Sequence, residues 1–90
     1  MSLKVVAYDL HLGTKEVYEE LITTIELATD NAIEIQKSVW VVSSDDDCET
    51  LRDILKLKID DNDKLFVAPL PKGSAWTGIK GLKKFIDDNR

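Results

Sequence analysis

Asp9 and His11 are the residues of this 90-residue chain whose types and spacing most clearly permit chemistry. Asp9 is the first polar residue after the start of the apolar run KVVAYDL, residues 4–10, so it is expected where a buried strand ends. Its carboxylate could hold an oxygen-preferring divalent metal ion, or it could accept backbone hydrogen bonds in the following loop. His11 is the single histidine and offers either a general base beside Asp9 or a solvated loop side chain. One carboxylate is at most a partial metal site, so the residues alone leave both alternatives open.

Other sequence patterns that suggest chemistry have simpler explanations. The acidic runs at residues 45–47 and 60–63 lack the glycine and distal glutamate of a calcium loop, and they predict helix capping and turns. GSAWTGIK, residues 73–80, departs from a phosphate-binding loop because Ile79 separates glycine from lysine and no hydroxyl residue follows. Cys48 lies in an acidic stretch that favours an unreactive thiol, and the chain has no serine or cysteine triad for covalent catalysis.

The distribution of charge indicates where a nucleic acid would bind. The net charge of −5 disfavours general binding of RNA or DNA, but residues 1–63 carry −9 and residues 64–90 carry +4. Phosphate contacts are therefore expected in the tail. The candidate nucleic-acid-binding residues are Lys72, Trp76, Lys80, Lys83 and Lys84. Trp76 falls in a loop, whereas Trp40 lies in an apolar strand and is predicted to be core or interface.

Four strands and two helices are predicted to position these residues. Strands are expected at residues 4–10, 32–36, 39–43 and 64–70, the second and third forming a hairpin. The first helix should run from an N-cap at Thr14 to near Thr29. Asp46 with Glu49 resembles a capping box that begins a second helix. A short C-terminal helix follows from the helical spacing of Ile79 and the apolar residues after it, weakened by Gly81.

The order strand-helix-strand-strand-helix-strand predicts an α+β, ferredoxin-like split βαβ fold with a short C-terminal helix. We expect a single domain over residues 1–90, with residues 71–90 as a C-terminal extension. A core this small makes a homodimer a natural way to bury more apolar surface. The chain has no apolar run of bilayer length and no leader pattern, so a cytoplasmic protein without membrane association is expected.

Four segments, in order, resemble one protein family. They are VVAYDL (residues 5–10), SVWVVSS (38–44), TLRDILKLKID (50–60) and DKLFVAPL (63–70). Together they are similar to the CRISPR-associated protein 2 family and its SinR-like relatives outside CRISPR loci. The tail SAWTGIKG, residues 74–81, looks more like the SinR-like relatives.

The resemblance implies a ferredoxin-like homodimer in which Asp9 faces its symmetry mate and shares a divalent metal, Mg²⁺ or Mn²⁺, with it. Family members have been regarded as metal-dependent endonucleases or endoribonucleases, or as non-catalytic dimeric scaffolds, and the resemblance does not choose among these. Members commonly follow the aspartate with basic residues, whereas here Lys15 stands among three glutamates. This departure favours a stand-alone relative over a role in CRISPR adaptation.

Overall fold

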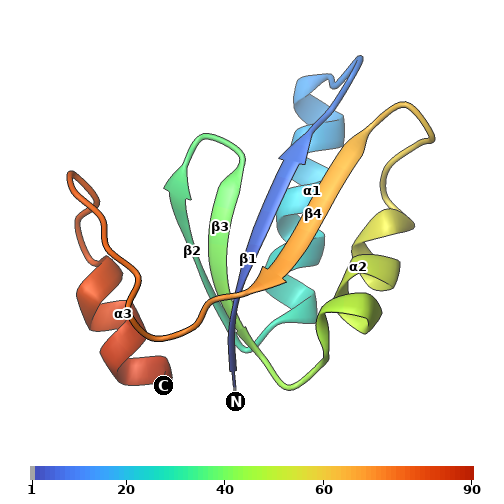
Figure 1. The fold of residues 1–90 in the computed structure, drawn as a ribbon. Helices are drawn as coiled ribbons and strands as arrows, with labels where there is room; N and C mark the ends of the chain where they lie inside the picture. Colours follow the sequence, from blue (N-terminus) through green and yellow to red (C-terminus); the bar gives the residue numbers. More distant parts are fainter. Residues whose placement is uncertain (1) are drawn as a thin grey trace.

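The computed structural model describes residues 2–90. Its elements, in chain order, are β1 (Ser2–Asp9), α1 (Lys15–Ala28), β2 (Asn31–Gln36), β3 (Val39–Ser44), α2 (Cys48–Lys56), β4 (Lys64–Pro69) and α3 (Leu82–Asn89). The predicted order of strands and helices is confirmed, and the strand boundaries agree within two residues. The protein is a small α+β structure with one four-stranded sheet and three helices in the described part of the chain (Figure 1).

The sheet has the strand order β2-β3-β1-β4, and every neighbouring pair is antiparallel. β1 is central, because Ala7 lies opposite Val39 on β3 and opposite Phe66 on β4. The predicted hairpin forms between β2 and β3. Its turn places Ser38 at a φ of 60°, in the left-handed region that most non-glycine residues avoid.

Helices α1 and α2 begin at side-chain caps. Thr14 caps α1 as predicted, its Oγ1 accepting a hydrogen bond from the Val17 amide at 3.3 Å. The predicted cap of α2 was wrong by one residue, since Asp47 rather than Asp46 accepts from the Thr50 amide, at 2.7 Å. The backbone amide of Asp46 is instead held by Ser44 Oγ at 3.1 Å, within the turn that leaves β3.

The main core lies between the sheet and the layer formed by α1 and α2 (Figure 1). The sheet contributes Val6, Tyr8, Trp40 and Val42, and the helices contribute Leu21, Ile25, Leu51 and Leu55. Trp40, predicted to be core or interface, is only 7% exposed and lies in the core. Trp40 belongs to this cluster and not to the cluster that packs with α3.

Helix α3 packs on the opposite face of the sheet, where Leu82 and Ile86 meet Leu3 and Val41. The predicted C-terminal helix included Ile79, but α3 begins only at Leu82. Gly81 has a φ of 83° and precedes the helix, so it marks the boundary and does not weaken an interior turn. Ile79 still packs against the same cluster from outside the helix.

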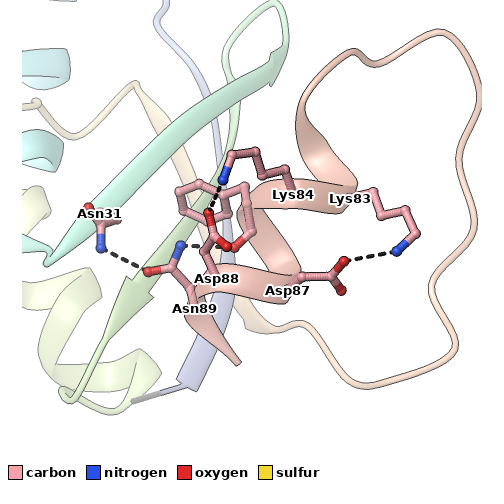
Figure 2. A network of polar contacts seen from close by, with 7 residues as sticks. Asn31, Lys83, Lys84, Asp87, Asp88 and Asn89 are labelled. Atoms are coloured by element: carbon pink, nitrogen blue, oxygen red, sulfur yellow. Dashed lines mark hydrogen bonds and ion pairs between the residues drawn. The ribbon is translucent and has the colours of Figure 1, made fainter.

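The far end of α3 is tied to the sheet by two asparagines. Asn31 Nδ2 donates to Asn89 Oδ1 at 2.8 Å, and Asn89 Nδ2 donates to the Phe85 carbonyl at 2.8 Å (Figure 2). Asn89 is 8% exposed, so these hydrogen bonds satisfy an amide that is largely removed from water. The described part of the chain contains no buried side-chain nitrogen or oxygen without a partner.

Helix α3 covers only part of its face of the sheet. On the half formed by β1 and β4, Ala7 and Asp9 stand opposite Phe66 and Lys64. We call these four residues the open strip. Phe66 is 63% exposed, a large exposure for an aromatic side chain in the middle of a strand. The strip therefore combines an apolar centre with one acidic and one basic side chain at its end.

Candidate functional site at the end of strand β1

Asp9 is the last residue of β1, and its side chain is exposed. Together with Lys64, Leu65, Ala7 and Tyr8 it lines a shallow depression of about 250 Å³. Lys64 lies directly opposite Asp9 in the β1–β4 register. Neither side chain forms an ion pair or a hydrogen bond with any residue from 2 to 90, so both charged groups are free to meet another molecule.

The residue before Asp9 is held both within the sheet and in the core beneath it. The Tyr8 amide donates to the Ser38 carbonyl at 3.1 Å, which joins the end of β1 to the β2–β3 turn. The Tyr8 hydroxyl accepts from Trp40 Nε1 at 3.1 Å inside the core. Burial raises the pKa of the Tyr8 phenol above 10.0, and the hydrogen bond from Trp40 acts in the opposite sense. Asp9 is thus presented by a rigid strand end.

His11 lies in the turn after β1 and is exposed, close in sequence to Asp9. Its backbone amide donates to Asp63 Oδ1 at 2.8 Å, and Asp63 Oδ2 accepts from the Asp60 amide at 3.0 Å. These backbone N–H groups, that of Asp60 foremost, hold the pKa of Asp63 below its usual 3.8. The acidic run at residues 60–63 thus has the turn-forming role predicted for it, and it joins the two loops beside Asp9.

Asp9 alone could offer a metal ion only one carboxylate. Among residues 2–90, no three histidine, cysteine, aspartate or glutamate side chains gather closely enough to hold a metal ion. Asp47 and Asp63 are occupied by backbone amides. A divalent ion at Asp9 would need further oxygen ligands from water, a substrate or a second copy of the chain.

The five tail residues predicted to bind nucleic acid separate into two groups. Lys83 and Lys84 form 2.8 Å ion pairs with Asp87 and Asp88, one helical turn further along α3 (Figure 2). These carboxylates offset the positive charge of both lysines. Lys72 and Lys80 are exposed and form no ion pair within the described residues, and Trp76 is 37% exposed in the loop before α3.

The tail does not meet Asp9 in the sheet. It leaves β4 at Pro69, which pairs with Lys4 near the start of β1, and the Leu70 amide donates to the Leu3 carbonyl at 2.9 Å. Asp9 lies at the other end of β1, and no tail residue lines its depression. The cation beside Asp9 is Lys64. Lys64 was not among the residues predicted from the sequence, although pairing the first residue of β4 with the last residue of β1 identifies it.

No protein-family model matches the sequence, and no curated protein matches it significantly. Within residues 2–90 the longest helix, α1, has 14 residues, and no helix has the length and apolar character needed to cross a membrane.

Proposed function

We propose that this protein is a homodimeric, divalent-metal-dependent endonuclease with a ferredoxin-like fold, related to the CRISPR-associated protein 2 family that its sequence resembles. The strand order β2-β3-β1-β4, with α1 and α2 on one face, supports the split βαβ assignment. RNA and DNA are both phosphodiester substrates for such an activity.

The position of Asp9 on the open strip carries the proposal. A two-fold symmetric contact uses the same patch on both copies, so the patch must be complementary to itself. Phe66 and Ala7 provide an apolar centre that can pack on the same two residues of a second copy, which leaves Asp9 and Lys64 available at the edge of the contact. Such a contact also draws the two Asp9 carboxylates toward one axis, which supplies the ligand that a single chain lacks.

The carboxylate oxygens of Asp9, the one ligand group that a single chain offers here, suit Mg²⁺ or Mn²⁺. The carboxylate is exposed, and oxygen donors suit these hard ions. Bound there, the ion would stabilise charge on a phosphodiester and activate a water molecule. In this proposal Asp9 is the metal ligand, Lys64 meets a phosphate oxygen as a point charge, and His11 is the candidate base in the adjoining turn.

The experiment compares wild-type protein, Asp9→Asn and Lys64→Gln at matched concentration on single-stranded RNA and double-stranded DNA. Cleavage should require Mg²⁺ or Mn²⁺ and should be lost in Asp9→Asn without a change in thermal unfolding. Mn²⁺ binding, followed by paramagnetic resonance, should give one ion per dimer and none for Asp9→Asn. Cleavage that persists in Asp9→Asn contradicts the proposal.

A second candidate is a non-catalytic dimeric scaffold or protein-interaction module. The incomplete metal set of one chain and the ion-paired lysines of α3 favour it. The same open strip would then serve assembly alone. A stable dimer that binds no Mn²⁺ and cleaves neither substrate would select this candidate.

A further inference from the structure

A cavity of about 290 Å³ lies between the sheet and the segment that joins β4 to α3. We call residues 71–81 of this segment the strap. The apolar walls include Val5 and Val41 of the sheet, Leu82 and Ile86 of α3, and Ala75 and Trp76 of the strap. The cavity shares no lining residue with the depression at Asp9. Its volume is near the lower limit of ligand pockets, about 300 Å³, so it suits a single ring system.

Three polar side chains interrupt the apolar lining. They are Gln36 at the end of β2, and Ser74 and Thr77 on the strap. The side-chain amide of Gln36 and the hydroxyl of Thr77 form no hydrogen bond with any described residue. The Ser74 hydroxyl, Oγ, donates to the Pro71 carbonyl at 3.1 Å. A side-chain amide offers a donor and an acceptor together, as the hydrogen-bonding edge of a nucleobase requires.

Trp76 gives the cavity an aromatic wall. Its ring is 37% exposed, and its indole N–H has no acceptor among residues 2–90. Gly73 and Gly78 flank residues 74–77 with φ values of 96° and 78°, and neither glycine has a neighbouring atom within 4 Å of an added Cβ. Both glycines therefore hold backbone conformations that side chains rarely adopt, and these turns set the course of residues 74–77 over the cavity.

Two free cations adjoin this aromatic segment. Lys72 precedes Gly73, and Lys80 follows Ile79, which also lines the cavity. Both are exposed and unpaired within the described residues, whereas the next lysines, Lys83 and Lys84, are held by carboxylates. Two unpaired lysines thus border, in sequence, the residues that line this cavity, on a chain whose net charge is −5.

We propose that this cavity binds a nucleobase whose attached phosphate lies outside, against Lys72 and Lys80. The base stacks on Trp76 and presents its edge to Gln36 and Thr77. This combination of an aromatic platform with edge contacts and lysines is the chemistry that recognises unstacked bases. A free nucleotide and a single-stranded nucleic acid share that chemistry. The binding needs no metal and does not depend on the function proposed for Asp9.

The test measures binding in EDTA, where metal-dependent cleavage is absent. The probes are adenosine monophosphate, followed by calorimetry, and a short fluorescein-labelled single-stranded oligodeoxyadenylate, followed by anisotropy. Trp76→Ala should weaken the binding by about 5- to 150-fold, the factor of one base–aromatic stack. Trp76→Phe should retain most of the affinity, and circular dichroism should show both variants folded.

Matched lysine variants distinguish binding at the cavity from nonspecific attraction of phosphate by positive charge. The pair Lys72→Gln with Lys80→Gln should weaken strand binding and remove about 1.4 from the slope of log affinity against log salt, as for two lost phosphate contacts. The pair Lys83→Gln with Lys84→Gln removes the same charge and should leave affinity unchanged. Equal losses of affinity in the two pairs, full affinity in Trp76→Ala, or no binding of either probe would overturn the proposal.

The two probes distinguish the source of the base. Tighter binding of the oligodeoxyadenylate than of adenosine monophosphate identifies single-stranded nucleic acid, and the reverse identifies a free nucleotide.

Discussion

Asp9 and Lys64 lie directly opposite each other at one end of the β1–β4 pair, yet their charged groups form no ion pair in the described chain. A surface pair of this kind would contribute little to the stability of a monomer. Its position beside Phe66, which is 63% exposed, gives it a different use. In the proposed two-fold dimer the phenyl ring would supply the apolar centre of the contact, and the two unpaired charges beside it would remain available to a metal ion and a phosphate.

Phe66→Asp should therefore prevent dimer formation. A central aromatic residue of an interface contributes about 2 kcal/mol or more, so the dimer dissociation constant should rise by about 30-fold or more. Sedimentation equilibrium measures this constant directly. Leu57→Asp is the matched control, because Leu57 is 82% exposed but follows α2, away from the open strip. Equal effects of the two substitutions would show that the open strip is not the interface.

The hydrogen bond between Trp40 and Tyr8 predicts a measurable loss of stability in Tyr8→Phe. This substitution leaves the Trp40 Nε1–H buried without its acceptor, which costs about 1–3 kcal/mol. The free energy of unfolding in urea reports the loss. Tyr18→Phe is the control, because Tyr18 is half-buried and its hydroxyl has no hydrogen-bond partner in residues 2–90. A loss as large in Tyr18→Phe would argue against the assigned role of the Trp40–Tyr8 pair.

Local patterns were enough to predict most of the secondary structure. The N-cap at Thr14, the β2–β3 hairpin and the buried Trp40 follow from side-chain chemistry and hydrophobic alternation, which act over a few residues. The α2 cap was placed one residue early because Asp46 and Asp47 are equally good caps locally. Only the turn after β3, where Ser44 holds the Asp46 amide, distinguishes them.

The candidate site was predicted only in part, because its composition depends on strand pairing. Asp9 was recognisable as a strand-end carboxylate, but its neighbour Lys64 is 55 positions away in sequence and is brought close by the register of β1 with β4. The tail lysines look alike in the sequence. Their difference arises from helix α3, whose period places Asp87 and Asp88 one turn beyond Lys83 and Lys84.

Acid should destabilise the protein partly through Asp63. Its pKa is below 3.8 in the folded chain because it accepts backbone N–H bonds from Asp60 and His11, so the unfolded state binds the proton more readily. The stabilisation is present above about pH 3.8 and is lost as the pH falls through the folded pKa. Asp63→Asn should have a lower melting temperature than wild type near neutral pH. Between pH 5 and 2 its melting temperature should then fall by less than that of the wild type. Asp61→Asn, a carboxylate of the same turn without a hydrogen bond in the described chain, should retain the wild-type decrease, and an equal flattening there would contradict this assignment.

Asn89 should matter more for the docking of α3 than the two lysine–aspartate pairs of that helix. Asn89→Ala removes the hydrogen bonds to Asn31 and to the Phe85 carbonyl from a nearly buried site, which should cost about 1 kcal/mol. Lys83→Ala breaks only an exposed pair within the helix and should have a smaller effect. Hydrogen exchange of the α3 amides, together with urea unfolding, measures both changes. Because Leu82 and Ile86 of α3 also form walls of the cavity beneath the strap, Asn89→Ala should weaken adenosine monophosphate binding as well, while Lys83→Ala should not. If exchange increases equally in the two variants, the asparagine contacts are not what holds α3 against the sheet.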